Sequence, residues 1–160
     1  MAAWGELAQR RPDLAEAGRE LLYQYGVGLA FLATIRKNLG PRLHPISPML
    51  TENGIFTFII PSPKQEDLQR DGRFALHSFP CENNEDAFYL TGLAERVGHL
   101  GVREELAKQF VSERSQSGAT PPADTDLLFE FKASQCLVTR TTGHGDPNPR
   151  HIIWHDQKGV

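Results

Sequence analysis

The segment from Leu29 to Phe79 limits the possible folds of this chain most strongly. An apolar run ends at the turn Asn38-Leu39-Gly40, and Glu52-Asn53-Gly54 supplies positive-φ residues for a second tight turn before IFTFII. The strand between the turns, at about 41–50, contains three prolines. Because proline has no N–H to donate to a neighbouring strand, this strand should be irregular or partly unpaired on one side. Three sequential antiparallel strands with such an interruption indicate a β-barrel.

Outside this segment, periodicity and turn residues define the other elements. Apolar residues recur at three- and four-residue steps from Leu14 to Tyr25, which predicts a helix that packs one face on the sheet. The length suits one domain, residues 1–160, with the barrel core at about 27–141. We expect strands at about 28–36, 41–50, 55–60, 73–79, 88–97, 127–140 and 150–156, and helices at 12–25, 63–71 and 101–114.

Three of these strands carry signs of burial or bending. IFTFII is apolar at nearly every position, so both of its faces should be covered, one by the barrel interior and one by a helix or a second subunit. Gly92 lies inside FYLTGLAERV, where it marks a bend or bulge. The alternation in LLFEFKASQCLVTR changes parity near Ser134-Gln135, which predicts a β-bulge.

The composition argues against nucleic acid and membranes as partners. The charged fraction is 23% and the net charge is -3, with no run of Lys and Arg long enough to follow a nucleic-acid backbone or an anionic membrane. No stretch reaches the roughly 18 apolar residues of a membrane span. The first residues lack the apolar centre of a signal peptide, so we expect a cytoplasmic protein. With nucleic acid and membranes set aside, an unidentified small molecule is the expected partner.

Ser62, Pro63 and Lys64 mark the start of a helix that suits an anion. Ser62 is an N-cap residue, Pro63 fits the first helical position, and Gln65 would complete a capping box. The first-turn amides and the positive end of the helix dipole then face outward, and Lys64 adds a charge that suits a phosphate. Many helices that bind no ligand begin in the same way, and two acidic residues nearby also complement the dipole.

The strand PRLHPIS presents further candidates. In strand alternation Arg42 and His44 share a face, while Ser47 points the other way. Arg42 suits a phosphate by bidentate hydrogen bonding, and His44 suits a phosphate or a flavin carbonyl. Taken singly, Arg42 is more often a surface ion-pair residue, and His44 a half-buried strand residue that bonds the backbone.

The other reactive residue types form no recognisable site. His144, Asp146, His151 and His155 lie around a Gly/Pro-rich loop, and their spacing fits no compact metal-ligand pattern. No serine or cysteine lies in a local signature of a catalytic nucleophile. We therefore expect neither a metal ion nor a nucleophilic catalytic residue.

Taken together, these pieces resemble the pyridoxamine 5'-phosphate oxidase-like superfamily of FMN-binding split barrels. The resemblance covers about residues 28–97, with weaker support from the helix and the strand that follow. It depends on four pieces in order: FLATIRKNLGPRLHPIS, the hairpin into IFTFII, SPKQEDLQRDGRFALHS, and FYLTGLAERV. No single piece is specific, but their order and spacing are.

The resemblance implies a mainly β, α+β fold, a six- or seven-stranded antiparallel split β-barrel with peripheral helices. It also implies a homodimer with FMN in grooves at the interface. In that superfamily the strand matching PRLHPIS lies along the flavin, the strand matching FTFII contributes backbone, and the helix start holds the phosphate. Trp154 in the last strand would reach the cofactor of the other subunit, or else belong to the core or interface. The implied cofactor-binding residues are Arg42, His44, Ser47, Ile59, Ser62, Lys64 and Trp154.

Departures from the true pyridoxamine phosphate oxidases leave the reaction open. Pro63 stands where an arginine commonly precedes the lysine of the phosphate motif, and Ala87 where those enzymes carry a flavin-contacting glutamine. We therefore expect an FMN-dependent oxidoreductase of unassigned substrate. One alternative is an F420-dependent reductase, and another is a non-catalytic flavin- or haem-binding protein. The basic groove for F420 would be lined by Arg36, Lys37, Arg70 and Arg73.

Overall fold

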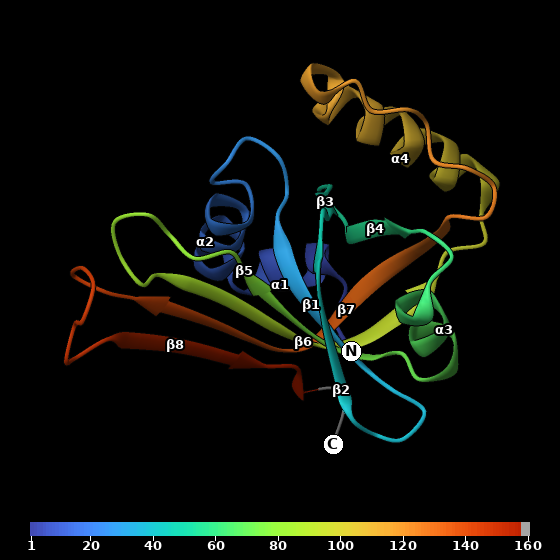
Figure 1. Ribbon diagram of the computed structural model, residues 1–160. Helices are drawn as coiled ribbons and strands as arrows, with labels where there is room; N and C mark the ends of the chain where they lie inside the picture. Colours follow the sequence, from blue (N-terminus) through green and yellow to red (C-terminus); the bar gives the residue numbers. More distant parts are fainter. Residues whose placement is uncertain (158–160) are drawn as a thin grey trace.

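A curled antiparallel sheet surrounds the core in the computed structural model, which describes residues 1–157 (Figure 1). The strands are β1 (Ala30–Ile35), β2 (Pro41–Ile46), β3 (Met49–Leu50), β4 (Ile55–Ile59), β5 (Arg73–Ser78), β6 (Ala87–Arg96), β7 (Leu127–Arg140) and β8 (Arg150–His155). The helices are α1 (Trp4–Arg10), α2 (Pro12–Leu22), α3 (Pro63–Arg70) and α4 (Leu100–Glu113), with a 3-10 turn η1 (Ser115–Ser117). The strand order is β2-β1-β5-β6-β7-β4-β3, and β8 pairs with β7. Among the described residues, no helix is long and apolar enough to cross a membrane.

The core follows from the alternation of the strands. Every second residue of β1, β5 and most of β6 is buried, and Leu32, Leu76 and Leu90 lie opposite one another across these strands. α2 packs on β6 and β7, where Gly18 leaves room for the Phe88 ring. The predicted α+β split barrel is confirmed, with the strand expected at 41–50 divided into β2 and β3.

A bulge bends β7 where the sequence predicts it. The β6–β7 register shifts between Thr91 and Gly92, and Ser134 is the extra residue on β7. A Cβ at Gly92 would lie 1.8 Å from the Lys132 carbonyl oxygen, so only glycine fits this close approach of two strands. The first part of β7 pairs with β4 and its last part with β8. One bent strand therefore joins the barrel to the outer strand.

β2 lies at an edge of the sheet. It pairs with β1 from Pro41 to Ile46 and, within residues 1–157, with no other strand. An edge strand tolerates proline because its outer groups need no partner strand. The strand breaks at Ser47, whose carbonyl and hydroxyl oxygens both accept hydrogen bonds from Arg114 at the end of α4. The predicted irregular strand is confirmed, and Arg114 stabilises the break.

β4 is covered on both faces, as its apolar sequence predicts. Ile55 and Ile59 face the barrel core, while Phe56 and Phe58 pack toward α4. Phe58 meets Phe110 edge-to-face, with ring centroids 6.0 Å apart. Within this chain the outer cover of β4 is therefore a helix.

The turn before β4 forms by a different mechanism from the one predicted. Neither Asn53 nor Gly54 has a positive φ among the described residues. Instead, the Thr51 hydroxyl accepts hydrogen bonds from both of their amides, at 3.1 and 2.9 Å. A Cβ at position 54 would lie 2.3 Å from the Phe56 ring, so a larger residue there would require that ring to move. In the first hairpin turn, Leu39 takes the positive φ, at 66°.

The N-terminal helices also differ from the prediction. α2 ends at Leu22 instead of residue 25, and Tyr25 is 51% exposed. Gly26 adopts a φ of 85°, so the chain turns away before another helical turn forms. α1 lies outside the sequence prediction because its N-cap residue, Ala3, has no polar side chain to mark a helix start; the Ala3 amide donates instead to Glu6 Oε2 at 3.1 Å. Burial of Trp4 and Leu7 stabilises this short helix.

Candidate anion-binding site

Three of the predicted ligand residues come together between β2 and α3. Arg42 and His44 lie on the half-buried face of β2, while their neighbours on the strand at 41, 43 and 45 are exposed. Lys64 lies in the first turn of α3, and its charge, like that of Arg42, lowers the pKa of His44. We call these three residues, together with Asp67 of α3, the β2–α3 cluster.

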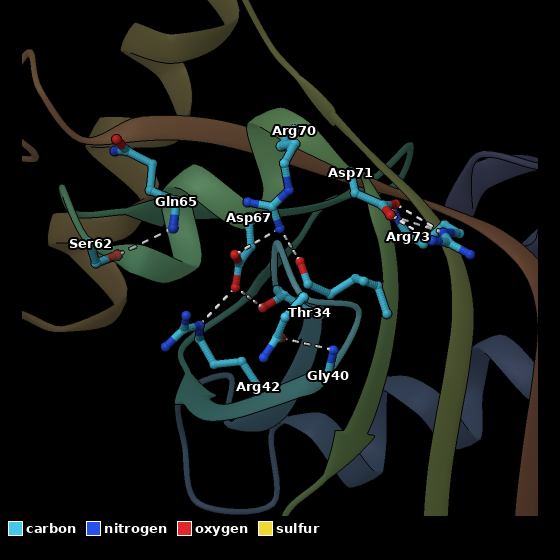
Figure 2. Close-up of polar contacts among 11 residues, drawn as sticks. Thr34, Gly40, Arg42, Ser62, Gln65, Asp67, Arg70, Asp71 and Arg73 are labelled. Carbon is cyan, nitrogen blue, oxygen red and sulfur yellow. Dashed lines mark hydrogen bonds and ion pairs between the residues drawn. The ribbon is translucent and has the colours of Figure 1, made fainter.

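The Ser62 cap forms as predicted, but the capping box does not. The Ser62 hydroxyl accepts a hydrogen bond from the Gln65 amide at 3.3 Å (Figure 2). The Gln65 side chain donates instead to the carbonyl oxygens of Ile59 and Thr125, at 2.7 and 3.0 Å. This side chain therefore ties the helix start to β4 and to the loop before β7. The Lys64 amide has no hydrogen-bond partner within residues 1–157.

Asp67 lies between Arg42, Thr34 and Arg70 and contacts all three, as Figure 2 shows. Its Oδ2 atom accepts hydrogen bonds from Arg42 Nε at 2.7 Å and from Thr34 Oγ1 at 3.1 Å. Its Oδ1 atom accepts from Arg70 Nη2 at 2.9 Å, and the same nitrogen donates to the Ile35 carbonyl. One buried carboxylate thus joins β1, β2 and α3.

Burial, hydrogen bonds and neighbouring charges shift the pKa values of Asp67 and His44. Burial raises the pKa of Asp67, but hydrogen bonds from its three donors outweigh burial and leave this pKa below its usual range. Burial lowers the pKa of His44. The charges of Lys64, Arg42 and Arg36 lower the same pKa further, and the charge of Asp67 opposes them. His44 is therefore a neutral imidazole at neutral pH, with one N–H to donate.

Lys64 is the unbalanced charge of the cluster. Burial lowers the pKa of its half-buried ammonium group, which has neither an ion pair nor a hydrogen bond within residues 1–157. Asp67 already contacts Arg42 and Arg70. A partly desolvated cation without a counter-charge is stabilised by an anion. The arrangement therefore suits a ligand with a phosphate or another strong anion.

Ser47 and Ile59 lie outside the cluster. The Ser47 hydroxyl donates to the Gly28 carbonyl at 2.7 Å and accepts from Arg114. The Ile59 side chain is buried in the barrel core, and its carbonyl accepts from Gln65. Both residues have structural partners, and a role for either at a cofactor stays a prediction.

Trp154 lies in a different part of the sheet. Five strand spacings of about 4.8 Å separate it from His44 along the sheet. The Trp154 ring lines a pocket of about 580 Å³ that includes Arg10 and His155. Its predicted role at the cofactor of a second subunit stays a prediction. The residues paired across the sheet from β2 to β8 are His44, Leu32, Leu76, Leu90, Cys136 and Trp154.

The basic residues considered for an F420 tail fall into two groups. Arg70 and Arg73 are engaged in ion pairs with aspartates of α3 and of the turn after it, at 2.9 and 2.6 Å. Arg36 and Lys37 are exposed in the turn between β1 and β2 and form no ion pair within residues 1–157. Only the second pair is therefore available to a ligand without breaking an existing contact.

Two important residues carry no distinctive sequence signal. Asp67 is typical of an acidic residue near a helix start, and Arg114 of a charged residue at a helix end. The i,i+3 spacing of Asp67 and Arg70 was the one local hint of an ion pair. Their decisive partners lie 25 residues from Asp67 and 67 residues from Arg114 along the chain.

Comparison with known proteins identifies the fold. No protein-family model and no curated protein matches the sequence. A heme binding protein from Mycobacterium smegmatis aligns over 87% of this chain, at a TM-score of 0.65 and 13% identity, and this chain spans 57% of that protein's length. PhzG from Burkholderia lata 383, solved with tetrahydrophenazine-1-carboxylic acid, aligns over 96% of this chain and 86% of its own, with a TM-score of 0.65 and 12% identity.

A third structure has nearly the same length as this chain. It is a Clostridium acetobutylicum protein related to general stress protein 26 of B. subtilis, of the pyridoxinephosphate oxidase family. The alignment covers 96% of this chain and 97% of the other, at a TM-score of 0.59 and 13% identity. The protein therefore has the split-barrel fold of the pyridoxamine 5'-phosphate oxidase-like superfamily, as its sequence pattern predicts. At such identities the likeness defines the fold, and the ligand must be argued from the site.

Proposed function

We propose that this protein binds FMN through the β2–α3 cluster and acts as a flavin-dependent oxidoreductase on a small molecule. The observation that supports this most strongly is Lys64, a half-buried ammonium group without a counter-charge, beside Arg42 and His44. A phosphate monoester carries close to two negative charges near neutral pH. Such a group supplies the charge that the cluster lacks.

The donors of the cluster fit a phosphate. Arg42 uses only Nε toward Asp67, and its two terminal nitrogens have no partner within residues 1–157. Lys64 offers its ammonium group and its amide, and His44 offers one N–H. Ser62 is less free than predicted, because its hydroxyl donates to the Ile60 carbonyl at 2.8 Å and caps α3. In this proposal Ser62 holds the helix start, and the other three residues contact the phosphate.

These contacts indicate what FMN and the protein would each contribute to the reaction. Bound FMN supplies the electron transfer, and the chain supplies binding, orientation and electrostatics. Arg42 and Lys64 neutralise the phosphate. His44, kept neutral by burial and by the neighbouring cations, donates a hydrogen bond without adding charge. The substrate and the electron donor stay unassigned.

We also propose a homodimer with the cofactor at the subunit interface. β2 turns Pro41, Leu43 and Pro45 outward, and Leu43 is 65% exposed. Phe31, which pairs with Pro45, stacks on Phe79 with ring centroids 4.5 Å apart. An apolar edge strand of this kind is stabilised when a second copy covers it.

Haem is the second candidate ligand, because a solved heme binding protein shares the fold. Haem carries two carboxylates, which suit the same cations of the β2–α3 cluster. F420 is the third candidate, because Arg36 and Lys37 are exposed beside the cluster and form no ion pair within residues 1–157.

Absorption spectroscopy of the purified protein, followed by titration with FMN, riboflavin, F420 and haem, separates these functions. We expect FMN to bind at least about tenfold more tightly than riboflavin, because only FMN carries the phosphate. A colourless protein that binds none of the four ligands would refute the proposal, and a Soret band without flavin binding would favour haem. Bound FMN that no nicotinamide donor reduces would favour storage or sensing over catalysis.

A further inference from the structure

We infer that Asp67 is the positioning residue of the anion site, because its carboxylate holds the Arg42 guanidinium by Nε and leaves both terminal nitrogens to the ligand. The inference rests on the proposed function for the location of the anion. It goes further by assigning a role to a residue that does not itself touch the ligand.

The geometry of the contact is one-sided. An arginine–carboxylate pair is frequently bidentate, with two nitrogens on two oxygens. Here Asp67 contacts Arg42 through Nε alone, at 2.7 Å. Oδ2 also accepts from Thr34, and Oδ1 accepts from Arg70, so both oxygens are occupied. The carboxylate therefore cannot turn to take the terminal nitrogens of Arg42 without losing an existing hydrogen bond.

The two partners differ in burial, which assigns Asp67 to support and Arg42 to ligand contact. The Asp67 side chain is 4% exposed and the Arg42 side chain 23% exposed. A ligand that arrives from solvent therefore meets Arg42 first, with Asp67 behind it. Fixing the guanidinium before the ligand binds removes part of the ordering cost of binding.

A second effect of Asp67 opposes the first. A carboxylate beneath an anion site repels the anion, and in a partly buried place this repulsion is only weakly screened. If repulsion were dominant, removal of the charge would tighten binding. Positioning predicts the opposite, so the direction of the change decides between the two effects.

The test compares wild type, Asp67→Asn and Thr34→Val with inorganic phosphate, FMN and riboflavin as probes. Asp67→Asn keeps the shape of the side chain and removes its charge. We expect it to weaken phosphate and FMN binding by about tenfold, because the ion pair that holds Arg42 is lost, with riboflavin changed by less than about twofold. Thr34→Val removes the other hydrogen bond to Oδ2 and should change all three affinities by less than about twofold.

A measurement on wild type alone covers the case in which Asp67→Asn does not fold. In NMR spectra of 15N-labelled protein, the Arg42 Nε–H should be protected from exchange, and phosphate should shift the terminal N–H resonances more than Nε–H. The reverse pattern would overturn the inference.

The outcomes separate this inference from the proposed function. Phosphate or FMN binding by Asp67→Asn that equals or exceeds wild type would overturn the positioning role, as would an equal loss of FMN and riboflavin binding. Phosphate binding without FMN binding in wild type would refute the proposed function. The phosphate affinities of wild type and Asp67→Asn would then decide the role of Asp67. Wild type that binds neither would refute both.

Discussion

A single hydrogen bond of 2.7 Å from Arg42 Nε to Asp67 Oδ2 ties the edge strand β2 to helix α3. β2 has one partner strand among the described residues, so α3 provides support that a second strand would otherwise give. The same bond holds Arg42, whose charge, like that of Lys64, lowers the pKa of His44, and Lys64 has no counter-charge within residues 1–157. The strand edge and the candidate site therefore depend on one contact.

Lys64→Met should weaken FMN binding by about tenfold or more, because it removes the charge closest to the helix start. Riboflavin binding should stay the same, since riboflavin has no phosphate. The matched control is Lys108→Met on α4, where the lysine is exposed and forms no ion pair within the described chain. Isothermal titration with both ligands measures the effect. Equal losses in the two variants would contradict a specific role for Lys64.

The contribution of Asp67 to stability should depend on pH. Its pKa is lowered in the folded state despite burial, so its charge stabilises the fold above the ordinary Asp pKa of about 3.9, and this stability is lost as pH falls through the lower folded pKa. Asp67→Asn should therefore be less stable than wild type near neutral pH, with a difference that shrinks below about pH 4. Urea unfolding of both proteins across this range measures it. A difference that grows on acidification would show the sign to be wrong.

Arg114→Leu should lower the free energy of unfolding by about 2–3 kcal/mol, because it leaves the Ser47 carbonyl without its charged donor. The loss also includes the stacking of Arg114 on Phe110, where Cζ lies 4.2 Å from the ring centroid. Arg96→Leu serves as the control, because Arg96 is exposed at the end of β6 and its side chain has no polar partner within residues 1–157. Urea unfolding should change by less than about 0.5 kcal/mol for the control. Similar losses in both variants would contradict the assigned role.

Gly92→Ala should cost more than about 3 kcal/mol, because its Cβ would collide with the backbone of β7 at the bulge. Gly98→Ala is the matched control, since a Cβ there meets no atom within 4 Å. Thermal unfolding followed by circular dichroism compares the two. A stable Gly92→Ala variant would mean that the strands separate at the bulge at little cost.

Leu43→Glu should shift a wild-type homodimer toward monomer, because it places a charge on the outward face of β2. Leu100→Glu is the control, since Leu100 is similarly exposed but lies at the start of α4. Light scattering after size-exclusion chromatography gives the mass of each variant. A monomeric wild type would refute the proposed dimer, and a Leu43→Glu dimer as stable as wild type would exclude this face from the interface.

The strands were predictable because their signals are local. The alternation of β1 and β5, the parity change at Ser134 and the glycine at position 92 act within a few residues. The Ser62 cap belongs to the same class, because its partner is the Gln65 amide three residues later. The turn at 52–54 shows the limit of this reasoning: its position was right, but a threonine hydroxyl and not a positive φ stabilises it.

The candidate site was only partly predictable. Arg42, His44 and Lys64 were expected together through a resemblance in the order of the elements, and in the structure the charges of Arg42 and Lys64 both lower the pKa of His44. The role of Asp67 was not predictable, because it depends on Thr34 and Arg42. These residues contact Asp67 only through the packing of β1 and β2 against α3.

By itself, then, the sequence determined which segments are strands, where the sheet bends and where helix α3 begins, because turn, cap and alternation energies act between near neighbours. The tertiary structure decided which charged side chains pair with one another. Asp67 is satisfied by Arg42, Thr34 and Arg70, while Lys64 has no counter-charge within residues 1–157. That outcome depends on which side chains the sheet order and helix packing bring within hydrogen-bonding distance, and no local pattern encodes it.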